Sequence, residues 1–436
     1  MQNQTNPPIA YTASVQSIGH YDVVVLGGGP AGVCAAIEAA RQGAKTLLVE
    51  ATGMLGGMAT SAMVGPFMTC YDRDGDHPIV GGLFREIIER LAEGGGAILP
   101  EFTDSPSIHT SFLKKYHRHV TPFDSFALQV LLDDMTKEAG VDLLLYTRFV
   151  DAICENGRIR TVILSALEGL RAVTGEIFID ATGNADVAAV SGVETWKGEE
   201  ESGIPQPATL MFEIDGCSDE EFEQLGKRPK RPIKVYRTPR EGIYKVNHEH
   251  VFNVDATDSR SMTAAHQEAR RQVVESFRVL KEETLGFSKA KIAGVAPVLG
   301  VRESRHVKGR YTITVEDVRD GVRFDDRIAM YGFGMDVHIR SKEMTGNFKV
   351  EVAPIYYIPY RSMLPLGCDN LLVAGKTISC LSQAAGGLRC MPAAMAMGQA
   401  AGLAAHMAIR AGCLPYEISV PDLQDGLRRL GALIDG

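Results

Sequence analysis

One segment near the start of the chain restricts the possible folds more than any other. Tyr21–Leu26 (YDVVVL) is a run of β-branched and apolar residues, typical of a buried parallel strand. The turn Gly27-Gly28-Gly29-Pro30-Ala31-Gly32 follows at once, and Val33–Gln42 has the small-residue pattern of a helix. A second apolar strand, Thr46–Val49, leads directly to Glu50. This order of strand, G-x-G-x-x-G turn, helix, strand and acid predicts a βαβ unit that binds a dinucleotide.

The three glycines of this motif and the acid after the second strand each have a physical role. Gly27 allows a sharp turn, Gly29 lets the backbone approach a pyrophosphate without a Cβ, and Gly32 lets the helix pack closely on the strand. Free N–H groups and the helix dipole then favour the phosphates at the helix N-terminus. Glu50 is placed to accept hydrogen bonds from a ribose, and its charge disfavours the 2′-phosphate of NADP. The motif by itself does not distinguish FAD from NAD.

A second glycine cluster follows the acidic end of that strand. Gly53–Thr60 (GMLGGMAT) contains three glycines directly after Glu50. Its position predicts a loop that folds back over the same dinucleotide, with a flexible surface loop as the alternative.

Later segments predict further strands of the same unit. Stretches 143–154 and 158–165 form a hairpin around an Asn-Gly turn. Glu176–Thr182 (EIFIDAT) is another strand, closed by a glycine. Asn370–Ala374 (NLLVA) precedes Gly375 and Lys376, and a small-residue helix around 392–405 comes after it.

Composition excludes several classes of protein. With 45 basic and 54 acidic residues the net charge is −9, which argues against nucleic acid as the main partner. The eight cysteines form no C-x-x-C pair and no zinc or iron–sulfur spacing. They are typical of reduced, buried thiols, and with no secretory signal in the first 20 residues we expect a cytoplasmic protein. The Ala-, Met- and Gly-rich stretch 388–409 is interrupted by polar residues, so we expect a buried helix and no membrane span.

Five segments carry a family resemblance. They are YDVVVLGGGPAGVCAAIEAARQGAKTLLVE, GMLGGMATSAMVGPF, IFIDATGNADVAAVSG, APIYYIPYRSMLP, and NLLVAGKTIS followed by GGLRCMPAAMAMGQAAGLAA, in that order. In these segments the chain resembles FAD-dependent oxidoreductases with the glutathione-reductase-like FAD fold. The closest branch is related to fumarate reductase flavoproteins and to the FAD part of heterodisulfide reductase. The resemblance covers roughly the first 70 residues, 140–195 and 295–410.

The resemblance implies an α/β fold, FAD as cofactor, and a Rossmann-type FAD-binding domain with a discontinuous substrate or cap domain. We expect a flexible tail over 1–19, the FAD-binding domain over 20–70, 130–195 and 350–436, and the substrate or cap domain over 71–129 and 196–349. The pocket would lie between the two, where such sites usually occur.

The resemblance also implies roles for individual residues. The pyrophosphate would lie on the first turn, the ribose on Glu50, the adenine beside the backbone of Val150, and the flavin pyrimidine at the start of the last long helix. The full set implied to contact FAD is Gly27, Gly28, Gly29, Pro30, Ala31, Gly32, Glu50, Gly57, Met58, Val150, Ala181, Thr182, Gly183, Asp186, Gly375, Lys376, Leu388 and Met391. Many relatives have an acid where Lys376 stands, so this lysine is expected near a phosphate or the flavin instead of the ribityl hydroxyls.

Two motifs that are absent from the sequence make certain kinds of redox enzyme weaker candidates than others. The loop after Glu50 lacks the redox cysteine pair of a disulfide reductase, and the chain lacks a second G-x-G-x-x-G for a pyridine nucleotide. We therefore expect hydride transfer between flavin N5 and a small polar organic substrate, at a C–H bond next to oxygen or nitrogen. Oxygen or a separate electron carrier would exchange electrons with the flavin. The alternatives are an NAD(P)H-fed reductase of an activated C=C bond and a non-catalytic flavin-binding subunit.

Four residues are candidates for catalysis. Asp336 and His338 are two apart and face the same way in an extended segment, so the carboxylate would fix the imidazole tautomer and raise its basicity. Arg361 is a candidate anchor for a substrate carboxylate. Arg389 is placed to touch flavin O2 or the substrate. For each, a structural hydrogen bond or salt bridge is the alternative.

Other charged or reactive groups carry weaker hypotheses. Arg302–His306 is most simply a solvated or ion-paired strand edge, and His248-Glu249-His250 is half a metal site at most, so no metal is predicted. Cys70 and His77 are conceivable points of covalent flavin attachment. The basic run Lys227–Arg240 is interpreted as a solvated loop, with a lid or partner contact as the alternative. A homo-oligomer is possible.

Overall fold

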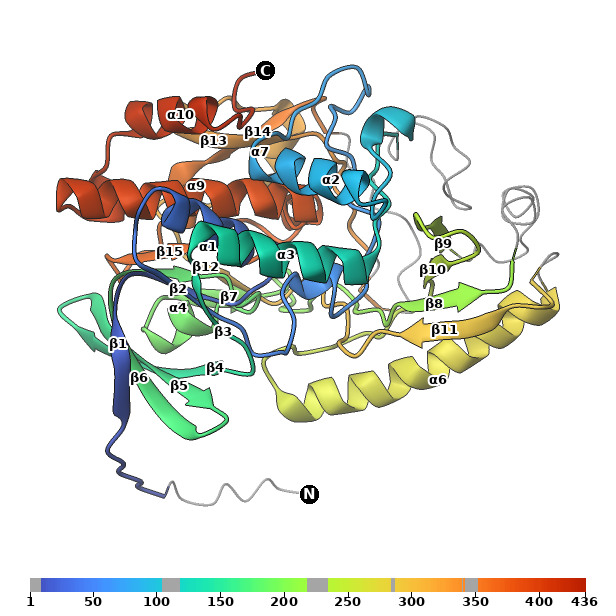
Figure 1. Ribbon diagram of the computed structural model, residues 1–436, viewed down its shortest axis with the longest axis horizontal. Helices are drawn as coiled ribbons and strands as arrows, with labels where there is room; N and C mark the ends of the chain where they lie inside the picture. Colours follow the sequence, from blue (N-terminus) through green and yellow to red (C-terminus); the bar gives the residue numbers. More distant parts are fainter. Residues whose placement is uncertain (1–8, 104–117, 218–233, 284–286, 339, 342–351) are drawn as a thin grey trace.

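The fold was analysed in a computed structural model that describes residues 9–103, 118–217, 234–283, 287–338, 340–341 and 352–436 (Figure 1). Its largest sheet has seven strands, with the order β3-β2-β1-β6-β5-β4 and with β15 also paired to β6. The parallel strands are β1 (Gln16–Leu26), β2 (Thr46–Val49), β3 (Asp142–Leu144), β6 (Gly169–Asp180) and β15 (Leu371–Val373). The antiparallel strands β4 (Arg148–Glu155) and β5 (Arg158–Ala166) extend the sheet beyond β6. The predicted α/β fold with a Rossmann-type unit is confirmed.

The long strand β6 joins two kinds of pairing. Its first half pairs with β5 from Gly169 to Thr174, and its last residues, Phe178–Asp180, pair with both β1 and β15. The parallel strands β1, β2, β6 and β15 all end at the same edge of the sheet as a result. Any loop that follows one of them opens at that edge, which is where ligands of parallel sheets bind.

Helices cover one face of this sheet. α1 (Pro30–Arg41) and α9 (Met391–Ala411) contact the sheet directly. Three further helices pack on these two: α2 (Leu83–Glu93), α3 (Ser125–Ala139) and α10 (Val420–Arg429). Two glycines of α9 allow α1 to approach closely, because a Cβ on Gly398 would lie 2.1 Å from the Ala31 carbonyl oxygen and one on Gly402 would lie 2.3 Å from that of Ala35. The contact between α1 and α9 thereby fixes the start of α9 relative to the glycine turn. On the opposite face, α4 (Asp186–Val190) packs in a separate hydrophobic core to which residues of β5 also contribute.

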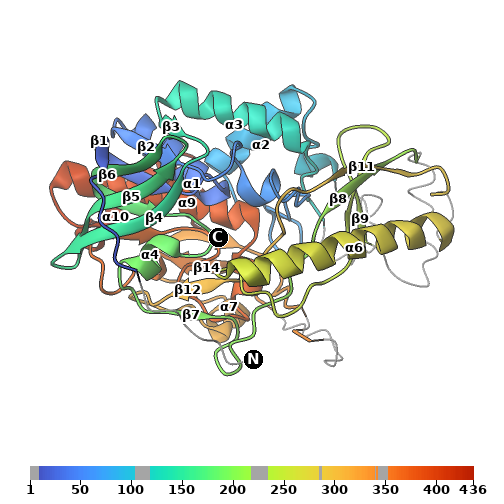
Figure 2. The same ribbon diagram turned by 90° about the horizontal axis from the view of Figure 1, so that it is seen from below.

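A second, smaller sheet forms the other end of the molecule. Its strand order is β11-β8-β10-β9, and the long helix α6 (Ser259–Glu283) packs on it (Figures 1 and 2). The strands are β8 (Phe212–Asp215), β9 (Lys234–Arg237), β10 (Tyr244–Asn247) and β11 (Lys291–Val295). This unit has its own hydrophobic core, formed by apolar residues of the sheet and of α6.

Two short ribbons and several short helices complete the described chain. The ribbons pair β7 (Thr195–Lys197) with β12 (Arg305–Val307) and β13 (Arg327–Tyr331) with β14 (Tyr356–Pro359). The short helices are α7 (Val315–Asp320), α8 (Ala385–Leu388) and the 3₁₀ turns Gly57–Ala59, Pro100–Phe102, Tyr360–Met363 and Pro415–Glu417.

Several boundaries differ from those predicted. Gln16 to Gly19, placed in a flexible tail from the sequence, belong to β1, which pairs with β6 over this stretch. The single strand predicted over 143–154 is two strands, and Tyr146 between them has a φ of 54°. The hairpin turn at Asn156 and Gly157 is confirmed, with φ values of 51° and 73°.

The assignment of 71–129 to the cap differs from the packing. Helix α2 lies in this range and contacts α9 and α3, within the hydrophobic core that also contains α1. Strand β13, which we placed in the cap, also packs on α9. Amphipathic spacing shows that a helix has a buried face but does not show which partner covers it. The division into an FAD-binding and a substrate domain stays a proposal.

Helix α9 is buried by other parts of the protein. Within the described ranges, no helix is both long and apolar enough to cross a membrane. Its small side chains are explained by close packing, since most of its residues from Met391 to Ala408 are buried.

The contact between α1 and α9 gives a stability prediction. Gly398→Ala places a Cβ against the Ala31 carbonyl, so we expect the free energy of unfolding to fall by about 1–3 kcal/mol. Thermal unfolding of the purified protein measures the effect. Gly94→Ala is the matched control, because Gly94 has a φ of −83° and its nearest neighbour would lie 3.6 Å from the new Cβ. Equal stability of the two variants would contradict the prediction.

Candidate active site

A single large cavity opens where β1, β2, β6 and β15 end. It has a volume of about 1640 Å³ and reaches from the glycine turn to the start of α9 and onto the second sheet. Pockets for one small ligand usually have volumes of about 300–1,000 Å³. The cavity therefore has room for a dinucleotide together with a second molecule.

The glycine turn has the geometry that its sequence predicts. Gly27 has a φ of 103°, and a Cβ there would lie 2.4 Å from the carbonyl oxygen of Ala181. A Cβ on Gly32 would lie 1.8 Å from the carbonyl oxygen of Gly27, so only glycine lets α1 pack at this distance. By contrast, a Cβ on Gly29 would have no neighbour within 4 Å. The backbone of Gly29 and the N-terminus of α1 thus lie open to the cavity.

Glu50 is held in place by its own loop. Its Oε2 accepts a hydrogen bond from the Gly28 N–H at 2.7 Å, and its Oε1 accepts from the Thr52 N–H and hydroxyl at 2.7 and 2.8 Å. Gly28 itself does not line the cavity but orients the carboxylate that does. A fixed acceptor at the end of β2 is what a ribose diol requires.

The loop after β6 is organised by a buried acid that the sequence analysis did not single out. Asp180 accepts hydrogen bonds from the N–H and hydroxyl of Thr182 and from the Ala188 N–H. Burial raises the pKa of this carboxyl, whereas these hydrogen bonds lower it. The loop residue Asp186 lines the cavity and forms an ion pair with Arg305 at 2.9 Å.

Most residues implied to contact FAD line this one cavity. They are Gly27, Gly29, Pro30, Ala31, Glu50, Gly57, Met58, Val150, Ala181, Thr182, Gly183, Asp186, Gly375, Lys376 and Met391. Gly28, Gly32 and Leu388 do not line it: the first two shape the turn, and Leu388 is buried in the core. Lys376 donates to the carbonyl oxygen of Val301 at 2.8 Å, and burial lowers its pKa to about 8.

A chain of three polar side chains lies at the other end of the cavity. His338 Nε2 is 3.1 Å from Asp336 Oδ2, and His338 Nδ1 is 2.7 Å from His250 Nε2. Arg389 donates to the carbonyl oxygen of Asp336 at 2.7 Å and lies 3.3 Å from its Oδ2. The structure thus brings three of the four predicted catalytic residues together and adds His250 to them.

These contacts define the protonation of both imidazoles. An ionised carboxylate only accepts, so His338 carries its proton on Nε2 and its Nδ1 accepts from the Nε2–H of His250. His250 Nδ1 is then the acceptor at the end of the chain. Burial and the positive charge of Arg302 lower the pKa of His338 to about 4 and that of His250 to about 2. Opposing its burial, contacts with His338 and Arg389 hold the pKa of Asp336 well below its ordinary value.

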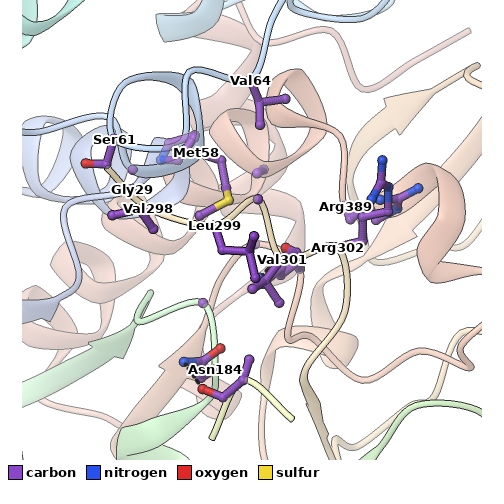
Figure 3. Close-up of a pocket in the computed structure, with 18 of the residues that line it drawn as sticks. Gly29, Met58, Ser61, Val64, Asn184, Val298, Leu299, Val301, Arg302 and Arg389 are labelled. Atoms are coloured by element: carbon purple, nitrogen blue, oxygen red, sulfur yellow. Dashed lines mark hydrogen bonds between the residues drawn. The ribbon is translucent and has the colours of Figure 1, made fainter. Parts of the chain in front are cut away.

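Sequence reasoning missed other residues of this end of the cavity. Arg302 donates from Nη1 to the carbonyl oxygen of Pro207 at 2.7 Å and to the Thr209 hydroxyl at 2.8 Å. Figure 3 shows Arg302 and Arg389 on the opposite side of the view from Gly29. Lys234 and Tyr236, both on β9, also line the cavity. Arg302 belongs to a dense run of charged residues, in which the sequence does not distinguish it from its neighbours. For Lys234 and Tyr236, the only indication was that side chains two apart on a strand point to the same face.

The prediction that Arg361 anchors a substrate carboxylate is wrong. It does not line the cavity. Its guanidinium lies over the rings of Tyr311 and Phe324, at 4.7 and 5.5 Å, and 3.7 Å from Asp326 Oδ1. The salt bridge that we gave as the alternative is therefore what the structure contains. Position shortly before β15 did not determine which way the side chain points.

The run Arg302–His306 is ion-paired, as one of our two interpretations stated. It is not a solvated edge, because Glu303, Ser304 and His306 are buried. Glu303 lies 3.0 Å from Arg340 and 3.4 Å from His306, and it accepts a hydrogen bond from Ser382. Burial opposes ionisation of both side chains. The contact with Cys380 and the ion pair with Glu303 nevertheless raise the pKa of His306 to about 10. The ion pair with His306 lowers the pKa of Glu303 to about 2. This network fixes the segment before β12, from which Arg302 extends.

The remaining hypotheses have simple outcomes. Cys70 is buried away from the cavity and His77 is exposed, so neither is placed for covalent attachment of a flavin there. In the described ranges, no group of three or more His, Cys, Asp or Glu side chains is arranged to hold a metal ion. Half of the basic run Lys227–Arg240, residues 227–233, lies outside the described residues. In the described half, Arg240 pairs with Asp124 and Glu213.

The fold and the cavity at the carboxyl ends of the parallel strands define a Rossmann-type dinucleotide-binding protein. The chain matches the family described as FAD dependent oxidoreductase over residues 22–427 and belongs to that family. The resemblance predicted from the sequence is confirmed, and FAD is the cofactor. The residues fit it, since the open glycine turn, the fixed Glu50 and the long cavity accommodate a dinucleotide.

Individual relatives match shorter segments or the overall shape. A segment is 51% identical over 47 residues to mitochondrial dihydrolipoyl dehydrogenase of Schizosaccharomyces pombe, covering 11% of this chain and 9% of that protein. Another is 37% identical over 71 residues to ferredoxin–NADP reductase 3 of Lysinibacillus sphaericus, covering 16% and 20%. These matches span a fifth or less of the curated relatives. A solved geranylgeranyl bacteriochlorophyll reductase-like protein from Thermoplasma acidophilum is 15% identical over 94% of this chain and 83% of its own, with a TM-score of 0.46. A p-nitrophenol 4-monooxygenase from Pseudomonas putida is 11% identical over 94% and 81%, with a TM-score of 0.47.

The histidine pair gives a prediction about pH. Both pKa values lie below the ordinary 6.5, so below pH 6.5 the unfolded chain takes up protons that the folded chain excludes until about pH 4 or lower. The free energy of unfolding therefore decreases as the pH falls from about 6.5 to 4. His250→Gln keeps a donor toward His338 but removes one titrating group, so we expect it to lose roughly 1–2 kcal/mol less than wild type between pH 7.5 and 5.

Denaturant unfolding at the two pH values measures the difference. His77→Gln is the control, because His77 is exposed and outside the cavity. If His250→Gln shows the same acid sensitivity as wild type and the control, the neutral histidine pair is wrong.

Proposed function

We propose that this family member oxidises or reduces a small polar organic substrate by hydride transfer at flavin N5. The observation that carries the proposal is that one cavity contains both the glycine turn with Glu50 and the chain Asp336–His338–His250. A cofactor site and an acid–base group in one enclosed space are what such an oxidoreductase requires. When bound, FAD supplies the acceptor or donor of the hydride.

The dinucleotide is held by the ends of the parallel strands. The N-terminus of α1 offers free N–H groups to the pyrophosphate, and Glu50 accepts from the ribose. The residues Ala181–Gly183 and Gly375–Lys376 follow β6 and β15 along the same edge. At the far end, Met391 begins α9, whose N-terminal N–H groups favour negative charge on the flavin pyrimidine.

The three-residue chain moves the proton. In the oxidation direction His250 Nδ1 accepts the proton of a substrate O–H or N–H. The carboxylate of Asp336, which keeps its negative charge because of its low pKa, offsets part of the cost that burial and Arg302 impose on the His250 imidazolium. Both imidazoles are neutral near pH 7, so the base is available without prior deprotonation. In the reverse direction the protonated His250 returns the proton to the substrate.

The partners of this reaction remain proposals. A small molecule is the substrate, and oxygen or a separate carrier exchanges the electrons. A cytoplasmic location and a homo-oligomer stay predictions from the sequence, as does the alternative of an electron supply from NAD(P)H.

FAD binding tests the first half of the proposal. We expect purified protein to be yellow and to release FAD on acid precipitation. Glu50→Ala removes a fixed ribose acceptor and should weaken FAD binding about tenfold or more. Flavin absorbance after equilibrium dialysis measures the affinity. Glu155→Ala is the control, because Glu155 is exposed at the end of β4, and a colourless wild-type protein that binds no added FAD would overturn the proposal.

The electron source is tested separately. Because the described cavity contains no second glycine turn of the G-x-G-x-x-G type, we expect NADH and NADPH to leave the flavin oxidised under anaerobic conditions. Flavin absorbance in a stopped-flow or cuvette experiment reports the result, with dithionite as the control for full reduction. Rapid bleaching by either nucleotide would instead identify an NAD(P)H-fed reductase.

A further inference from the structure

The end of the cavity that contains His250 and His338 is strongly cationic. Arg302, Arg389 and Lys234 line it, and they come from three separate parts of the chain. Among the described residues, Asp336 is the one carboxylate that interacts with all three. Because both imidazoles there are neutral, three positive charges face a single negative charge. A buried surplus of positive charge is costly unless an anion joins it.

Arg302 presents a free bidentate edge. Its Nη1 is committed to the carbonyl oxygen of Pro207 and the hydroxyl of Thr209. Among the described residues, Nε and Nη2 of Arg302 have no hydrogen-bond partner, and neither is sealed from the cavity. The Nε–Nη2 edge of a guanidinium matches the two oxygens of a carboxylate. The protein thus fixes Arg302 from one side and leaves the pairing edge open.

Lys234 and Arg389 are also incompletely paired. In the part of the chain that the structure describes, Lys234 lies within ion-pair distance of no carboxylate, and burial together with Arg302 and Arg389 lowers its pKa below the ordinary value. Arg389 contacts Asp336 through Nη2, but its buried Nε has no partner among the described residues. An anion at this point would satisfy both groups.

From this arrangement we infer that the substrate carries a carboxylate, which Arg302 binds side-on and Lys234 neutralises, with Arg389 linking this subsite to Asp336. The inference rests on the proposed function, whose substrate it specifies. The phosphates of the dinucleotide are expected at Gly29, at the opposite side of Figure 3, so they do not account for these cations. With the carboxylate on Arg302, the reacting carbon lies between the anion subsite and the His250 acceptor.

Ligand binding to the FAD-loaded protein tests the inference without knowledge of the substrate. Benzoate and succinate are the probes, and benzamide and succinamide are uncharged controls of the same shape. The readout is the perturbation of the flavin absorbance spectrum during titration. We expect saturable binding of at least one carboxylate and none of its amide.

Variants locate the binding site. Arg302→Met and Lys234→Met should each weaken carboxylate binding about tenfold or more, since each removes a charged partner. Arg302→Lys keeps the charge and controls for loss of the contacts to Pro207 and Thr209. We expect it to bind more weakly than wild type but more tightly than Arg302→Met. Lys291→Met removes one positive charge from an exposed position of the same sheet and should bind like wild type.

The outcomes separate the inference from the proposed function. Loss of FAD binding by wild type would reject the proposed function itself. Normal FAD content with equal binding of carboxylates and amides, or with unchanged binding in both Arg302→Met and Lys234→Met, would reject only the carboxylate subsite. Saturable perturbation of the flavin spectrum by inorganic phosphate, with none by the carboxylates, would also reject it, in favour of a phosphorylated ligand.

Discussion

The parallel pairing of β6 with β1 and β15 is the constraint on which the rest of the molecule depends. It makes the carboxyl ends of β1, β2, β6 and β15 meet at one edge of the sheet. The glycine turn, Glu50, the Asp180 loop and Gly375 all follow these ends directly. Four segments, spread along the chain from Gly27 to Gly375, therefore line one cavity.

Close packing of α9 on α1 fixes the position of the far end of the cavity relative to the glycine turn. Gly398 and Gly402 of α9 allow contact with the carbonyl groups of α1, which itself begins at the glycine turn. The start of α9 therefore has a fixed position relative to the pyrophosphate site. Arg389, just before α9, joins this frame to Asp336. Small residues in α9, which superficially suggested a membrane segment, are explained by this contact.

The acid–base end of the cavity depends on burial as much as on hydrogen bonds. Burial and Arg302 keep His250 and His338 neutral, and the ion pairs of Asp336 keep it ionised. Two groups that would each titrate near neutral pH in water are thereby set to one state. The same burial leaves Arg302 and Lys234 as cations that an anionic ligand would complete.

Local patterns in the sequence were sufficient for the nucleotide half of the site. The turn at Gly27–Gly32 and the acid at Glu50 lie within one βαβ unit, so their geometry depends on neighbours in the sequence and on backbone sterics. For the same reason Asp336 and His338 were predicted as a pair. Arg361 was misplaced because its position along the chain does not determine the direction of its side chain, which is fixed by stacking on Tyr311 and Phe324.

The sequence by itself therefore determined the fold class and the cofactor, and it predicted most of the residues that line the cavity around the glycine turn and Glu50. Only the tertiary structure decided that His250 meets His338 at 2.7 Å and that Arg302, Lys234 and Arg389 share one cavity. His250 and His338 are separated by 88 residues, and they meet because the second sheet packs against the first unit. Such long-range contacts depend on how separate hydrophobic faces are paired, which periodicity and motif spacing do not specify.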